Sequence, residues 1–165
     1  MKIAGLVHDS IVDGPGLRYV VFVQGCMLRC DGCHNPDTWD AGGGTEVSVD
    51  EIIKEMLSNP LTDGLTLSGG EPFGQAADCV SLAAAAHEKG LNVWVFTGKT
   101  FEELHEESRT DPSVEELLKL TDILVDGRYI DTKRTLSQKW CGSANQRVID
   151  VPESLIAGKV VVCCD

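Results

Sequence analysis

Three cysteines lie close together in the sequence. Cys26, Cys30 and Cys33 form a C-x3-C-x2-C pattern, so one loop can wrap three thiolates around a single inorganic centre. Structural zinc sites usually take four protein ligands, whereas a four-iron cluster held by three cysteines leaves one iron open to another ligand. The spacing therefore favours an iron–sulfur cluster. A zinc site completed by His34, and buried thiols that bind nothing, are the two alternatives.

The other four of the seven cysteines have no comparable spacing: Cys79, Cys141, Cys163 and Cys164. Cys79 lies in an alanine-rich segment with helical character, where a small buried residue is the simplest interpretation. The adjacent pair Cys163 and Cys164 is interpreted as simple thiols, with an accessory metal or redox site as the alternative.

A second candidate segment is the run Gly69, Gly70, Glu71 and Pro72. It follows a short predicted strand at residues 65–67, and its glycines would let the backbone approach a bound ligand closely. An ordinary turn is the alternative, because glycine and proline interrupt secondary structure in many loops.

The elements that must position these residues alternate along the chain. Apolar runs predict strands at residues 18–24, 65–67, 91–96 and 122–125, and helices are predicted at residues 48–58 and 75–89 and after Thr100 and Asp111. This alternation is typical of a parallel sheet, in which ligands gather at the carboxyl ends of the strands. Cys26, Gly69, Thr97 and Asp126 should therefore lie along one edge. Beyond residue 128 the helical pattern weakens, and residues 146–151 and 159–163 are possible last strands.

Composition limits the classes of function. The chain has 165 residues, with 14 Lys and Arg against 26 Asp and Glu, and a net charge of −12. Such a charge argues against a nucleic-acid partner or an anionic membrane surface. No stretch approaches the ~18 apolar residues of a membrane helix, so we expect a cytoplasmic protein with reduced thiols. We expect one domain, with a core at about 17–127 and a C-terminal extension at about 128–165.

The cysteine loop and the Gly-Gly-Glu-Pro segment together resemble the radical S-adenosylmethionine superfamily. Residues 13–40 (DGPGLRYVVFVQGCMLRCDGCHNPDTWD) are similar to the activases of glycyl-radical enzymes. Residues 65–75 (LTLSGGEPFGQ), 123–130 (ILVDGRYI) and 142–151 (GSANQRVIDV) resemble one branch, the activating proteins of anaerobic ribonucleoside-triphosphate reductase. The short length agrees with that branch, since pyruvate formate-lyase activases are longer chains.

The resemblance implies a single α/β domain built as an incomplete (β/α) barrel, with a [4Fe-4S] cluster and S-adenosylmethionine as cofactors. It implies an oxidoreductase that makes a 5′-deoxyadenosyl radical and takes hydrogen from a glycine of the large reductase subunit. The expected electron donor is a reduced flavodoxin or ferredoxin. The alternatives are an activase of another glycyl-radical enzyme, such as pyruvate formate-lyase, another small radical enzyme of this superfamily, and a non-enzymatic iron–sulfur or zinc module.

The resemblance also implies roles for individual residues. The expected cluster ligands are Cys26, Cys30 and Cys33, and the expected S-adenosylmethionine contacts are Gly32, Cys33, His34, Gly69, Gly70, Glu71, Thr97 and Asp126. No side chain is expected to be catalytic, because the cluster and S-adenosylmethionine carry the chemistry. Residues 13–16 (DGPG) are expected near the mouth of the site, with a tight turn as the alternative.

Two positions depart from the family pattern. Gly32 stands where an aromatic residue is common, and Cys141 stands where a basic residue is more usual. Stacking on adenine from position 32 is therefore not available. His34 and Trp39 are the candidates to replace it, and a Trp39 that is simply packed is the alternative.

Overall fold

The computed structural model describes residues 1–163, and a seven-stranded sheet runs through this part of the chain. The strands are β1 (Lys2–Ser10), β2 (Arg18–Val23), β3 (Thr45–Glu46), β4 (Gly64–Gly69), β5 (Asn92–Phe96), β6 (Ile123–Asp126) and β7 (Arg147–Asp150). Their order across the sheet is β3-β1-β2-β4-β5-β6-β7. The central strands β2, β4, β5 and β6 are parallel, and the outer strands β1, β3 and β7 pair antiparallel.

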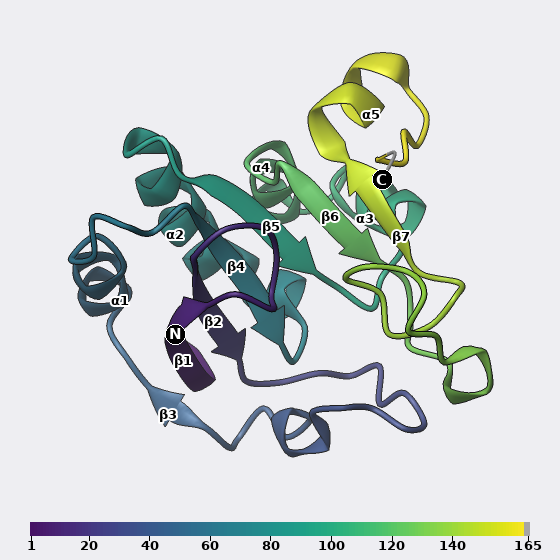
Figure 1. Ribbon diagram of the computed structural model, residues 1–165, viewed down its shortest axis with the longest axis horizontal. Coiled ribbons are helices and arrows are strands. Elements are labelled where there is room, and N and C mark those ends of the chain that lie inside the picture. Colours follow the sequence, from purple (N-terminus) through teal and green to yellow (C-terminus); the bar gives the residue numbers. More distant parts are fainter. Residues whose placement is uncertain (164–165) are drawn as a thin grey trace.

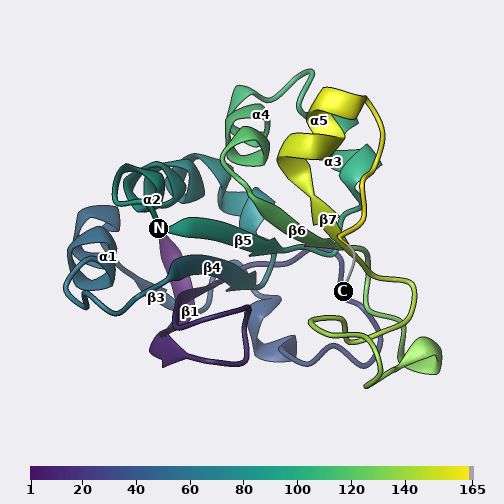
Figure 2. The same ribbon diagram turned by 45° about the horizontal axis from the view of Figure 1, so that its top comes forward.

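Five α-helices occur in the same residues and cover one face of the sheet. They are α1 (Val49–Met56), α2 (Ala76–Glu88), α3 (Phe101–Glu107), α4 (Pro112–Lys119) and α5 (Val151–Ala157). Figure 2 shows α1, α2, α4 and α5 on one side of the strands, with long loops on the other side. None of the helices within residues 1–163 is long and apolar enough to cross a membrane.

The main core lies between the helices and the sheet. Alternate strand residues such as Val21, Leu67 and Val95 are fully buried there, against Leu82 and other residues of α2. Removing a Val or Leu side chain completely from water contributes about 1.5–3 kcal/mol, so this layer supplies most of the hydrophobic stabilisation. The strands are thereby fixed as a rigid platform for the loops at their ends.

The other face of the sheet contains a buried arginine. Arg18 donates hydrogen bonds to Thr66 Oγ1 at 3.0 Å and to the Leu65 carbonyl oxygen at 2.5 Å, and its guanidinium lies over the Trp94 ring. Burial lowers the pKa of Arg18 to about 10, although the nearby carboxylates of Asp63 and Asp122 oppose this shift. Because Arg18 also donates to Asn92 Oδ1 at 2.5 Å, it links the starts of β2, β4 and β5.

The predicted fold class is confirmed as an incomplete barrel whose sheet stays open. The strands and helices expected between residues 18 and 125 form close to their predicted limits. The sheet also extends beyond the predicted core of residues 17–127, because β1 and β7 add strands on either side.

Two expectations near the C-terminus need correction. Residues 159–163 make a single bridge between Ile149 and Val162 and do not form a strand of their own. The helix α5 was not expected, although Asp150 caps it through the Glu153 N–H at 2.9 Å and Gly158 ends it with φ 64°. Cys164 lies outside the described residues, so the interpretation of the Cys163 and Cys164 pair stays a prediction.

Candidate functional site

A large cavity lies at the carboxyl ends of the parallel strands. Figure 1 shows their arrowheads pointing toward the loop after β2 and the long connection between β6 and β7. The cavity has a volume of about 640 Å³, within the range of roughly 300–1,000 Å³ for small-molecule and cofactor sites. Seven of the predicted site residues line it: Cys26, Cys30, Cys33, His34, Gly69, Gly70 and Thr97.

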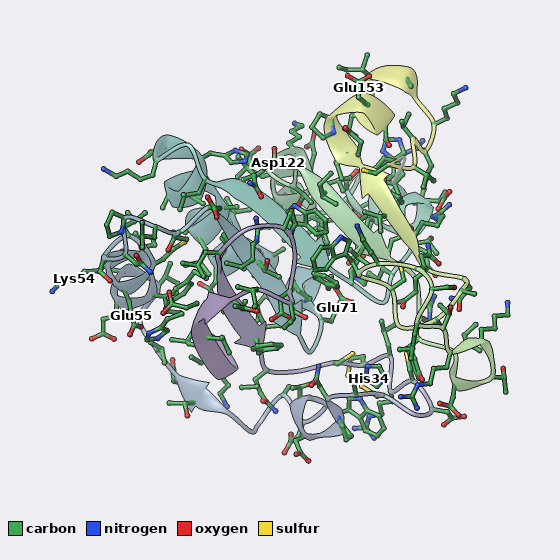
Figure 3. The ribbon with its side chains drawn as sticks, in the orientation of Figure 1. His34, Lys54, Glu55, Glu71, Asp122 and Glu153 are labelled. Carbon is green, nitrogen blue, oxygen red and sulfur yellow. The ribbon has the colours of Figure 1, made fainter. Side chains whose placement is uncertain are left out.

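The three cysteines lie on one loop, residues 26–39, called the cysteine loop below. The loop is closed at its base, because the Gly25 N–H donates to the Thr38 carbonyl oxygen at 2.7 Å and the Cys26 N–H donates to the Trp39 carbonyl oxygen at 3.2 Å. The Gln24 side-chain amide adds a hydrogen bond of 2.7 Å to the Asp40 carbonyl oxygen. The end of β2 therefore fixes both ends of the loop. Figure 3 shows His34 beside sulfur atoms in this region.

The three thiols line the same cavity, as the ligands of one shared cluster must. Among residues 1–163, no group of three or more His, Cys, Asp or Glu side chains is placed to hold one metal ion. A [4Fe-4S] cluster takes each thiolate on a separate iron, so its ligands need not converge on one point. Trp39 also lines the cavity, and its buried indole N–H has no hydrogen-bond partner within the described part of the chain. A ligand acceptor could satisfy this donor.

Gly69 and Gly70 bring the end of β4 against the end of β2. Gly69 has φ 95°, and a Cβ atom on Gly70 would lie 2.4 Å from the carbonyl oxygen of Gly25. The Glu71 N–H donates to that same oxygen at 2.9 Å, and the Gly70 N–H donates to the Val23 carbonyl oxygen at 2.8 Å. Both glycines thus allow close backbone packing beside the first cysteine, and both line the cavity.

Glu71 lies behind the large cavity and does not line it. Its buried carboxylate accepts hydrogen bonds from Thr97 Oγ1 at 2.8 Å, from the Gly98 N–H at 3.1 Å and from the Phe73 N–H at 3.1 Å. Burial raises the pKa of Glu71, and these donors oppose the shift. In this conformation Glu71 joins the ends of β4 and β5. Its contact with a cofactor stays a prediction.

Asp126 is also engaged by the protein itself. Its carboxylate accepts from Arg147 Nε at 3.0 Å and from the Phe101 N–H at 2.8 Å, and it is 1% exposed. Asp126 does not line the cavity, whereas the next residue, Gly127, does. The structure therefore gives Asp126 a partner on β7 and a place at the start of α3, and its cofactor contact stays a prediction.

One wall of the cavity was not expected from the sequence. The connection between β6 and β7 supplies Tyr129, Trp140, Gly142 and Gln146 to the lining, together with Cys141. Residues 123–130 and 142–151 carried part of the family resemblance, but no pattern predicted that this connection would line the cavity.

Gly32 is exposed and does not line the cavity. Its φ of 74° favours glycine, and a Cβ atom there would lie 3.1 Å from Asp131. A larger side chain at position 32 would therefore be strained and would come close to the β6–β7 connection in this chain.

Residues 12–149 match the family model described as "4Fe-4S single cluster domain". The chain is 33% identical over 172 residues to the pyruvate formate-lyase 1-activating enzyme of Escherichia coli (strain K12), covering 98% of this chain and 67% of that protein. It is 37% identical over 139 residues to the pyruvate formate-lyase-activating enzyme of Clostridium pasteurianum, covering 78% and 55%. The Staphylococcus aureus (strain USA300) enzyme is 38% identical over 151 residues, covering 87% and 59%.

The open barrel and its cysteine loop thus define an iron–sulfur protein with a cofactor cavity at the strand ends. The chain belongs to the 4Fe-4S single cluster domain family, and its relatives are activating enzymes of the radical S-adenosylmethionine type. The family match and the relatives confirm the predicted oxidoreductase class and the two predicted cofactors, a [4Fe-4S] cluster and S-adenosylmethionine. The chain spans 55% to 67% of the length of the relatives named above. Membership of the ribonucleotide reductase branch is not shown.

Proposed function

We propose that this chain activates a glycyl-radical enzyme by removing a hydrogen atom from a glycine of its partner. The observation that carries the proposal is the placement of three cysteines and the Gly69-Gly70 strand end around one cavity. The relatives that carry the same domain are activating enzymes. When bound, the cluster and S-adenosylmethionine would supply a 5′-deoxyadenosyl radical.

The protein's own residues would hold and shield these groups. Cys26, Cys30 and Cys33 would ligate three irons, and the close packing at Gly69 and Gly70 would present strand-end backbone to S-adenosylmethionine. The walls from the cysteine loop and the β6–β7 connection would keep water and other C–H bonds away from a reactive carbon centre.

The opening for the partner is proposed at the loop of residues 13–16. Asp13 lines the cavity, and its carbonyl oxygen accepts from Thr66 Oγ1 at 2.8 Å. Thr66 in turn accepts from the buried Arg18 at 3.0 Å. The loop is therefore anchored to β4 beside the cavity, where a glycine segment of a larger enzyme could enter.

The preferred partner is a pyruvate formate-lyase. The relatives named above are activating enzymes of that protein, and this favours the first of our sequence-based alternatives, an activase of another glycyl-radical enzyme. Anaerobic ribonucleotide reductase is the second candidate, because residues 142–151 resemble its activating proteins. Part of this segment lines the cavity, at Gly142 and Gln146. The electron donor proposed for either case is a reduced flavodoxin or ferredoxin.

Cleavage of S-adenosylmethionine tests the cofactor half of this proposal. The full chain, reconstituted anaerobically with iron and sulfide and then reduced, should form 5′-deoxyadenosine and methionine. Cys30→Ala should lower the iron content and abolish cleavage, because a cluster ligand is lost. Cys79→Ala is the matched control, since Cys79 is buried in α2 away from the cavity. A reduced wild-type protein that cleaves no S-adenosylmethionine would contradict the proposal.

A further inference from the structure

The connection between β6 and β7 touches the cysteine loop near three of its residues. The contacts involve Tyr129 and Asp131 on the connection and Cys30, Gly32 and His34 on the loop. These two segments are about a hundred residues apart in sequence, so only the fold brings them together. Lining the cofactor cavity does not by itself explain why the β6–β7 connection packs against the cysteine loop.

The first contact is made by the main chain. The Tyr129 main chain lies beside the Cys30 thiol. Tyr129 lies three residues beyond the end of β6, whose last residue Asp126 is held by Arg147 and by the Phe101 N–H. The main chain beside Cys30 therefore follows a firmly held strand end.

The second contact is made by the Tyr129 ring. Its centroid lies 4.6 Å from that of His34, with the ring planes tilted by 51°. A Cβ atom on Gly142 would lie 3.1 Å from the Tyr129 ring and 3.4 Å from His34. The pair thus packs closely against Gly142, where a larger side chain would be tight, and Tyr129 and His34 both line the cavity.

The third contact places Asp131 beside Gly32. The Tyr129 hydroxyl donates to Asp131 Oδ1 at 3.0 Å, and a Cβ atom on Gly32 would lie 3.1 Å from Asp131. Tyr129 therefore contacts the cysteine loop through its main chain and its ring, and its hydroxyl holds Asp131 beside Gly32.

We propose that Tyr129 is a positioning residue for the iron–sulfur cluster, because from the β6–β7 connection it holds the cysteine loop in place. We call this contact the clasp. The inference rests on the proposed ligand role of the three cysteines. Residues outside the ligand set that orient ligands typically change metal affinity about 10–100-fold when they are replaced. The surroundings of the cluster sulfurs, including hydrogen bonds and solvent exposure, also help to set the reduction potential of the cluster.

Iron retention tests the clasp without using activity. The reconstituted full chain is exposed to an iron chelator under anaerobic conditions, and iron release is followed. Tyr129→Ala removes the ring and hydroxyl, and should release iron about tenfold faster than the wild type. Tyr129→Phe keeps the ring, and should release iron at nearly the wild-type rate. Potentiometry of Tyr129→Ala should show a shifted reduction potential, because the loop that carries the cluster ligands is less firmly placed.

His105→Ala is the matched control. His105 is exposed on α3 and stacks on Phe101 with centroids 6.2 Å apart, so this variant loses a ring contact far from the cavity. Wild-type iron release and potential in Tyr129→Ala, or equally fast release in His105→Ala, would overturn the proposal.

A second variant protects the test against misfolding. If circular dichroism shows that Tyr129→Ala does not fold, His34→Ala removes the same ring contact from the exposed loop side. His34→Ala should then release iron faster than the wild type, and an unchanged rate would overturn the clasp. None of these measurements contains S-adenosylmethionine or a partner. A loss of S-adenosylmethionine cleavage is therefore distinguishable from a failure of the clasp.

Discussion

At the scale of single residues, the site depends on glycines, because their lack of a side chain allows close packing of the main chain. Gly70 leaves space for the Gly25 carbonyl oxygen, and Gly98 leaves space for Leu28, whose Cδ1 would lie 2.4 Å from a Cβ atom at position 98. Each of these glycines lets a strand end lie against the beginning of the cysteine loop. The thiols are thereby held close to the sheet and not on a detached loop.

Gly70→Ala should disturb this packing. The new methyl group would meet main-chain atoms of Gly25, which cannot move aside like a flexible side chain. We expect a loss of about 1–3 kcal/mol in the free energy of unfolding, as for overpacked core positions. Iron incorporation should also fall, because Cys26 follows Gly25 directly.

Gly74→Ala is the control for this substitution, since nothing lies within 4 Å of a Cβ atom there and its φ is not in the left-handed region. Urea unfolding of both variants measures the difference. Equal free energies of unfolding and equal iron contents would show that the contact at Gly70 is unimportant.

At the scale of elements, one arginine joins three parts of the fold. Arg147 on β7 pairs with Asp126 at the end of β6 and with Glu102 on α3, at 2.8 Å from Glu102 Oε2. These hydrogen bonds lower the pKa of Glu102 to about 2 and raise the pKa of Arg147. The β6–β7 connection, which lines the cavity, is therefore held at both ends by this ion pair.

Arg147→Ala should destabilise the protein, because it leaves the Asp126 carboxylate buried without its cationic partner. Breaking a fully buried pair costs about 3–5 kcal/mol, and we expect about 2–3 kcal/mol here because the Arg147 side chain is partly exposed. Denaturant unfolding measures this change. Arg109→Ala breaks an exposed pair with Glu106 and should cost less than about 1 kcal/mol. Equal losses in the two variants would contradict the role given to Arg147.

The same scale shows which elements the sequence could predict. The strands β2, β4, β5 and β6 are apolar runs, and α3 begins with the expected capping pair of Thr100 and Glu103. The strand β1 was missed because it contains Gly5, His8 and Asp9 and its pairing with β2 is irregular at two places. The helix α5 could have been recognised from its Asp150 cap, its early proline and Gly158.

The candidate site likewise contains residues that the sequence could predict and residues that it could not. The position of the cysteines and of Gly69-Gly70 at the cavity could be predicted, because it follows from local spacing and from the ends of strands. Tyr129 could not, because its contacts with Cys30 and His34 arise only when distant segments fold together. Glu71 and Asp126 are polar residues at strand ends, as expected, but the protein's own donors occupy their carboxylates.

At the scale of the whole molecule, the open sheet and the acidic composition agree with the proposed protein partner. The sheet of residues 1–163 ends at β3 and β7 without closing, so the cavity is bounded by loops as well as by strands. A net charge of −12 does not favour a polyanionic substrate. A glycine segment of a larger enzyme would therefore be recognised through loops at the cavity mouth.

The most direct test of the proposed function is electron paramagnetic resonance of the partner after activation. The reduced, cluster-loaded chain is incubated anaerobically with S-adenosylmethionine and either pyruvate formate-lyase or the anaerobic ribonucleotide reductase, and Cys30→Ala is the control. We predict a glycyl radical signal on pyruvate formate-lyase, lost when its target glycine is replaced by alanine and absent with Cys30→Ala. A signal on the reductase alone would reverse the choice of partner. Formation of 5′-deoxyadenosine with no glycyl radical on either enzyme would contradict the proposed function.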